Sequence, residues 1–297
     1  MNYEVCRSPE NGFLGLQITQ TEFDSLMRAQ KTIKAVSDIE FRYDMLLGNF
    51  LDLQRMTFEI IASSTLRYKP DMNSLLLPLV PIGRVFQNFL STASAYVGQF
   101  RSSALKSLKQ GANLIVEQER DRSFEFRVME SLRNHAMHKG LPVRSYRPHG
   151  GWENITDPKL AKRKERMAIS LSVEDLLQDP RSSSDVLQEL KQRNPNDIDL
   201  LAWSKHYLES LSKIHIGIRE LMKDEENQAR SLRAAAVTRF AELNGKLHMD
   251  FVLATEKDSS GNVCRETYLN PQLENLVDSL RSRNKALGAY SRVEIVV

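Results

Sequence analysis

The strongest constraint on the fold is a long apolar stripe in residues 37–63. Apolar side chains recur there at steps of three and four, which is the spacing of one face of an α-helix. They are Ile39, Tyr43, Leu46, Leu47, Phe50, Leu53, Met56 and Ile60. The stripe predicts one long helix that ends near Tyr68, because Pro70 disfavours helical geometry at the residue before it.

The same periodicity returns in other parts of the chain. We expect helices at about 81–108, 114–138 and 197–243, and a shorter last helix at 271–287. Long helices joined by short connections are typical of a helical bundle. The chain is therefore predicted to be mainly α.

Strand signals are confined to short segments. Residues 3–6 and 13–18 flank an Asn-Gly turn, and residues 249–254 and 263–269 flank an Asp-Ser-Ser-Gly sequence that is typical of a hairpin. A further strand is expected at 167–173, followed by a turn of helix. These signals predict a small β component made of N-terminal strands and a C-terminal hairpin.

The helical pattern is interrupted once, in a stretch rich in proline and glycine that also carries the basic run 159–166. We interpret this stretch as an insertion. The expected organisation is an N-terminal β and turn segment at 1–30, a helical core at 31–141, the basic insertion at 142–196, a long helix completing the bundle at 197–243, and a hairpin with the C-terminal helix at 244–297.

Positive charge is concentrated in the middle of the chain. The whole sequence has 41 Lys and Arg against 38 Asp and Glu, whereas residues 101–166 alone have 15 against 8. A positive local field suits a polyanionic partner, most commonly nucleic acid. The alternative is a solvated basic surface without a ligand.

Several classes of protein are not supported by the composition. No apolar run reaches the roughly 18 residues that a membrane-spanning helix needs. The first residues include Glu4 and lack a cationic segment followed by an apolar one, so no secretory signal is expected. Cys6 and Cys264 are too few for a disulfide scaffold. These features predict a cytoplasmic protein with no membrane partner.

The sequence lacks phosphate-binding loops, the G-x-S-x-G nucleophile elbow and the H-E-x-x-H zinc helix. What remains is a polar cluster at the end of the 114–138 segment, where Arg133, Asn134, His135 and His138 fall within six residues. A histidine in the last turn of a helix is favoured in its charged form by the helix dipole, and a histidine near its titration point suits general acid and base chemistry.

Helix geometry limits how these side chains meet. Asn134 and His138 share a face, whereas Arg133 and His138 lie about 140° apart and about 7.5 Å along the axis. Three arrangements bring the latter pair together: the helix loosens before Gly140, the long Arg133 side chain reaches round, or a second chain completes the site.

Two other interpretations of the cluster are open. Arg and His near a helix end commonly bond the last backbone carbonyls. The spacing of His135 and His138 also suits a metal, but His149 is the only nearby third ligand, so no metal is expected.

The sequence Arg133-Asn134-x3-His138, which follows an amphipathic helix, resembles the R-x4-6-H motif of the HEPN superfamily. The residue after Arg in that motif is typically Asn, Asp or His, and both the Asn and the spacing of four fit. The resemblance covers about 31–141, with 197–243 as a fourth helix, and is to a larger bacterial-type member. It leaves the insertion, the terminal strands and the hairpin unexplained.

The resemblance implies a HEPN-like long-helix bundle and a metal-independent endoribonuclease without a cofactor. Such enzymes work as homodimers and cleave RNA by attack of the 2′-hydroxyl. His138 would carry the proton transfers, Arg133 would hold the phosphate through its forked donors, and Asn134 would orient the substrate. Glu130 and His135 are auxiliary candidates.

The partner expected from the resemblance and the basic middle is RNA. The residues assigned to RNA binding are Lys139, Arg144, Lys162, Arg163, Lys164 and Arg166. Relatives occur in toxin–antitoxin and antiviral systems, which implies a toxin or defence effector with an antitoxin or other defence-system partner. The alternative function is a catalytically inactive dimeric scaffold or sensor that binds protein or nucleic acid.

Overall fold

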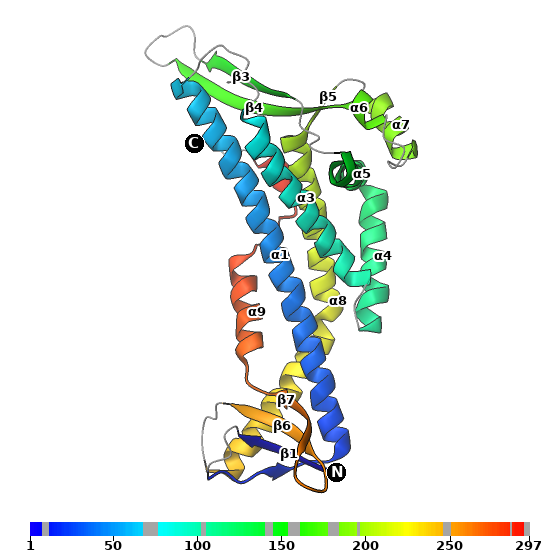
Figure 1. Ribbon diagram of the computed structural model, residues 1–297, viewed down its shortest axis with the longest axis vertical. Coiled ribbons are helices and arrows are strands. Elements are labelled where there is room, and N and C mark those ends of the chain that lie inside the picture. The colour runs from blue at the N-terminus through cyan, green and yellow to red at the C-terminus, as the bar shows by residue number, and fades with distance from the viewer. Residues whose placement is uncertain are drawn as a thin grey trace. The chain divides into compact units, whose positions relative to one another are not determined.

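The computed structural model describes residues 1–7, 12–67, 77–101, 105–139, 145–153, 161–177, 184–194, 197–245, 251–285 and 287–293. Its element order confirms a mainly α fold with a small antiparallel β component (Figure 1). The long helices are α1 (Gln20–Arg67), α3 (Leu79–Arg101), α4 (Lys106–Arg122), α5 (Phe124–Lys139) and α8 (Leu200–Leu243). No helix within these described ranges is long and apolar enough to cross a membrane.

The chain forms two compact units. Unit 1 comprises Met1–Asp44, Ser103–Gly111 and Gly217–Lys285, and unit 2 comprises Met45–Ser102, Ala112–Ile216 and Ala286–Val297. Helices α1, α4 and α8 each contribute residues to both units. The predicted motif and the basic run belong to unit 2.

Unit 1 contains a four-stranded antiparallel sheet in the order β2-β1-β6-β7. Its strands are β1 (Asn2–Arg7), β2 (Leu16–Gln17), β6 (Val252–Lys257) and β7 (Val263–Tyr268). The N-terminal strands and the C-terminal hairpin are therefore confirmed, and β1 pairs directly with β6. The expected hairpin residues 249 and 250 lie outside the described residues. Phe23 of α1 and Phe240 of α8 are fully buried against this sheet.

Buried ion pairs hold α9 (Gln272–Arg283) to α1 and α8 within unit 1. The Glu40 carboxylate, 1% exposed, accepts hydrogen bonds from Arg219 at 2.8 and 2.7 Å and from Arg281 at 2.9 Å. Arg281 also donates to Glu226 at 3.0 and 2.7 Å. Each buried carboxylate thus has a guanidinium partner, which compensates for the loss of solvation.

A chain of aromatic rings joins four helices in unit 2. The centroids of Phe50 in α1 and Phe89 in α3 are 5.4 Å apart, and Phe89 lies 6.0 Å from Tyr207 in α8. Tyr207 in turn lies 5.2 Å from Phe126 in α5. All four residues are at most 2% exposed, so these rings form the centre of the core on which α5 is positioned.

A second antiparallel sheet lies in unit 2, in the order β3-β4-β5. Two of its strands fall within the predicted insertion, and the third, β5, is formed by residues that were expected to begin the long helix at 197–243. Its strands are β3 (Ser145–Glu153), β4 (Lys162–Ser172) and β5 (Asp197–Asp199), and the short helices α6 (Val173–Leu177) and α7 (Ser184–Arg193) follow β4. The expected strand at 167–173 exists, but it begins five residues earlier and includes most of the basic run. Charged residues gave no apolar alternation from which this extension could be predicted.

Helix boundaries differ from the sequence expectations where a polar side chain caps a helix. The first helix begins at Gln20, not near 37, because Thr19 and Glu22 form a reciprocal capping box. The expected helix at 114–138 is two helices that meet at Ser123, whose hydroxyl accepts the Phe126 N–H at 3.1 Å. The last long helix begins at Leu200, since Asp199 accepts the Leu201 N–H at 2.9 Å.

A carboxylate on α8 holds the C-terminal 3-10 turn η1 (Tyr290–Arg292) in unit 2. Glu209 accepts hydrogen bonds from the Ser291 backbone and hydroxyl, at 3.1 and 2.6 Å, and pairs with Lys213 at 2.9 Å. Burial alone would raise the pKa of Glu209, but these donors outweigh it and lower the pKa from 4.5 to about 2.

This pKa predicts an acid-sensitive contact. A carboxylate with a depressed folded-state pKa stabilises the fold above its unfolded pKa, and the contribution is lost as the pH falls from about 4.5 towards about 2. Glu209→Gln should therefore lower the free energy of unfolding at pH 7 and make it less dependent on pH between 5 and 3, as measured by urea unfolding. Glu220→Gln, an exposed change on the same helix, should leave both quantities unaltered.

Candidate functional site

The predicted motif lies in the last two turns of α5. The side of this helix that faces the unit 2 core carries Val128, Leu132 and Ala136 at four-residue steps, each at most 3% exposed. Glu130, Asn134 and His138 also follow one another at steps of four, two positions further along the helix. They therefore occupy a line about 200° around α5 from this stripe, and the same line begins one turn earlier at Phe126, which is buried in the aromatic core.

The structure removes one of the three arrangements considered for Arg133 and His138. Helix α5 stays α-helical as far as Lys139, so the backbone does not loosen before Gly140. The two residues keep the angular separation of a regular helix, about 140°. Reach of the Arg133 side chain or completion by a second chain are the two arrangements left.

Arg133 is half-buried beside the aromatic core. Among the described residues it makes no hydrogen bond or ion pair. Its charge acts on the buried Tyr207 hydroxyl: burial raises the pKa of Tyr207 far above its usual range, Glu130 adds to this, and Arg133 and Arg120 oppose it.

Glu130, an auxiliary candidate, is held by a neighbour that the sequence did not indicate. Arg120 of α4 donates to its carboxylate from Nε at 3.0 Å and from Nη2 at 2.9 Å. Burial opposes the charge on Arg120, but hydrogen bonds to Glu117 and Glu130 outweigh it and raise the pKa of Arg120. Both donors bond the same oxygen, Oε2, and this charge-assisted pair fixes the Glu130 side chain against α4. The pairing could have been predicted only by recognising the helix break at Ser123, which brings α4 and α5 together.

The remaining predicted residues can be assigned to a helix or strand, except for one that lies outside the described residues. His135, His138 and Lys139 are in α5. Lys162, Arg163, Lys164 and Arg166 are in β4, where they pair with β3. Arg144 lies outside the described residues.

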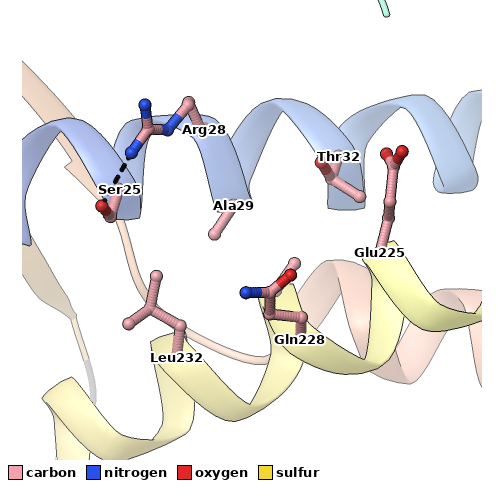
Figure 2. Close-up of a pocket in the computed structure, with 8 residues that line it drawn as sticks. Ser25, Arg28, Ala29, Thr32, Glu225, Gln228 and Leu232 are labelled. Carbon is pink, nitrogen blue, oxygen red and sulfur yellow. Dashed lines mark hydrogen bonds between the residues drawn. The ribbon is translucent and has the colours of Figure 1, made fainter. Parts of the chain in front are cut away.

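Unit 1 contains a separate small pocket of about 270 Å³ between α1 and α8. Figure 2 shows Arg28 at one end, donating to Ser25 Oγ at 2.9 Å, and Glu225 at the other, with Ala29 between them. Its lining offers no imidazole or thiol, so it does not supply the acid–base chemistry expected of an RNA-cleaving site.

Across the described ranges, no group of three or more His, Cys, Asp or Glu side chains is arranged to hold a metal ion. Comparison of the chain with protein-family models, with curated proteins and with solved structures finds no match. The function is therefore inferred from the residues of α5 and their surroundings.

Proposed function

We propose that the protein is a metal-independent endoribonuclease of the HEPN type that acts as a homodimer. The observation that carries the proposal is the placement of Arg133, Asn134 and His138 within one regular helix, at the end of an aromatic-centred group of four helices. The Arg133 guanidinium has no ion pair among the described residues, which leaves it able to bind a phosphate. By the same resemblance, the setting is a toxin or defence system.

The proposed reaction is transfer of a phosphodiester within the RNA strand. The 2′-oxygen attacks the adjacent phosphorus, the bond from phosphorus to the 5′-oxygen breaks, and the products are a 2′,3′-cyclic phosphate and a 5′-hydroxyl. Neutral His138 accepts the 2′-hydroxyl proton, and a protonated imidazole returns a proton to the leaving 5′-oxygen. Arg133 stabilises the charge that develops on the phosphorane.

Completion of the cleft by a second chain solves the angular problem in α5. A twofold axis supplies a second Arg133 and a second His138, so that the arginine of one protomer and the histidine of its partner serve the same phosphate. The Glu130 carboxylate, which Arg120 holds, lies one helical turn before Asn134 in each protomer.

The decisive experiment uses matched RNA substrates in EDTA. A single-stranded RNA should be cleaved to cyclic-phosphate ends, and the same oligonucleotide with 2′-O-methyl groups should stay intact because its nucleophile is blocked. Cleavage of both substrates would exclude 2′-hydroxyl attack. Cleavage of neither, by a chain that is dimeric in light scattering, would favour the inactive scaffold instead.

Arg133 should contribute to the transition state rather than to binding. Arg133→Ala is expected to slow cleavage by roughly 2 to 4 kcal/mol, by analogy with the removal of one oxyanion donor. Arg133→Lys should recover only part of this loss, because an ammonium lacks the planar fork of a guanidinium. Single-turnover rates measure the effect.

The matched control is Arg122→Ala, an exposed cation at the end of α4. It should leave the cleavage rate at the parental value. Equal losses for Arg122→Ala and Arg133→Ala would show that only general positive charge matters.

A further inference from the structure

The register of β3 against β4 sorts the residues of the basic run onto two faces. Partners in an antiparallel ladder lie on the same face, and the face alternates at each residue. The cationic face, as we name it, consists of the pairs Ser145↔Ser170, Arg147↔Ala168, His149↔Arg166, Gly151↔Lys164 and Glu153↔Lys162. The aromatic face consists of Tyr146↔Ile169, Pro148↔Met167, Gly150↔Glu165 and Trp152↔Arg163.

Charge is distributed unequally between these faces. The cationic face has four Lys and Arg positions, one carboxylate and one histidine, whereas the aromatic face has one arginine and one glutamate. The net positive charge of the paired residues therefore lies entirely on the cationic face. Arg147 and His149 were not predicted to bind RNA but lie on the cationic face. Arg163 was predicted to bind RNA but lies on the aromatic face.

The aromatic face continues into the core of unit 2. Ile169 and Leu171, which follow one another on this side of β4, are each 1% exposed. On the cationic face Ala168 is half-buried, and Ser170, which pairs with β5, is 8% exposed. Strand β5 pairs with β4 only at 170–172. From Lys162 to Ala168 the described ladder thus consists of β3 and β4 alone. Its aromatic face is the one that continues to the buried residues Ile169 and Leu171.

We propose that the cationic face of β3–β4 is an RNA-binding surface that holds a single strand by its phosphates; this inference rests on the proposed function, since it assigns the substrate contact of the same protein. Three of the four Lys and Arg positions, Lys162, Lys164 and Arg166, alternate along β4 at backbone spacings of about 6.7 Å, and Arg147 lies on the neighbouring strand, about 4.8 Å away, opposite Ala168. Lysine and arginine in such an array bind a polyphosphate backbone without reading its bases.

Single-stranded RNA is favoured over a duplex by the size of the array. Two short strands offer four cationic positions on one face, which matches a few consecutive phosphates of one strand. Binding through phosphates releases counterions, so each contact contributes about −0.7 to the slope of log K against log salt for a single strand.

The test compares two neighbouring cations, Arg163 and Lys164, that lie on opposite faces of the ladder. A fluorescently labelled single-stranded RNA is titrated by anisotropy at several salt concentrations, in a His138→Ala background that prevents cleavage. Lys164→Gln should weaken binding and flatten the salt slope by about 0.7, and Lys164→Gln with Arg166→Gln by about 1.4. Arg163→Gln, the same loss of charge one residue away, should bind like the background chain.

Two controls complete the test, a charge-preserving variant and a duplex RNA of the same length. Lys164→Arg preserves the charge and should bind RNA like the background chain, which shows that the effect of Lys164→Gln comes from the lost charge and not from misfolding. Equal effects of Arg163→Gln and Lys164→Gln, or no effect of either, would overturn the assignment of the face, as would tighter binding of duplex RNA of the same length.

Cleavage is assayed separately on the parental chain. If the cationic-face variants lose RNA binding but the parental chain cleaves no RNA, the proposed enzyme is rejected and the RNA-binding surface is retained. If the parental chain cleaves RNA but binding does not depend on the face, the surface is rejected and the enzyme is retained.

Discussion

Replacing His138 with alanine is expected to reduce cleavage of single-stranded RNA by about 10²- to 10⁴-fold. The variant loses the group that is proposed to take the 2′-hydroxyl proton and to return one to the leaving oxygen. RNA binding should persist, because His138 lies in α5 whereas the cations that are proposed to hold the RNA strand lie in β3 and β4. Single-turnover cleavage in EDTA, measured beside anisotropy, separates the two effects.

Two other histidines provide matched controls for this prediction. His206 is exposed on α8 and outside the motif, so His206→Ala should cleave at the parental rate. His135→Ala should have a smaller effect than His138→Ala, since His135 is an auxiliary candidate. A His138→Ala chain that cleaves as fast as the His206→Ala chain would refute the acid–base assignment.

Mixing variants separates the two remaining geometries of the site. In a dimer of one Arg133→Ala chain and one His138→Ala chain, a cleft built from both protomers retains one intact Arg133 and His138 pair. Cleavage then returns to a substantial fraction of the parental rate. If Arg133 instead reaches round its own helix, neither site in the mixed dimer is intact, and the mixture stays as inactive as its components.

The helices could be predicted where burial is periodic, and their ends only where a cap is recognised. The apolar stripe from Ile39 to Ile60 identified α1 because one side of that helix is buried along its length. Its first five turns were missed although Thr19 and Glu22 carry a readable capping signal. The break at Ser123 was missed although six polar residues, 117–122, directly precede it.

Long-range pairing limits what the sequence can show of the candidate site. The order of Arg133, Asn134 and His138 along one helix follows from local spacing alone. The engagement of Glu130 by Arg120 depends on a reversal at Ser123, and the separation of Arg163 from Lys164 depends on the register with β3. The helix break and the strand register each decide which side chains lie together. The types of residue in the candidate site could therefore be predicted from the sequence, but their contacts could not.

The largest expected loss of stability is at Arg233, a guanidinium of α8 that is 2% exposed in unit 1. It donates to Glu274 at 2.7 Å, to the carbonyl oxygens of Tyr268 and Asn270 at 2.9 and 3.0 Å, and to Gln30. Arg233→Met keeps a long apolar side chain but leaves the Glu274 carboxylate buried without its cation. Breaking such a pair from one side costs about 3 to 5 kcal/mol of unfolding free energy.

Urea unfolding followed by far-UV circular dichroism measures this loss, and two variants identify its cause. Arg239→Met removes a half-exposed cation of the same helix that pairs with Glu22, and should cost about 0 to 1 kcal/mol. Arg233→Met combined with Glu274→Met removes both buried charges and should recover much of the stability, because the penalty comes from the uncompensated carboxylate. Both tryptophans, Trp152 and Trp203, belong to unit 2, so their fluorescence reports that unit rather than the site of the change. If Arg233→Met cost no more than Arg239→Met, the cluster around Arg233 would contribute little to the stability of unit 1.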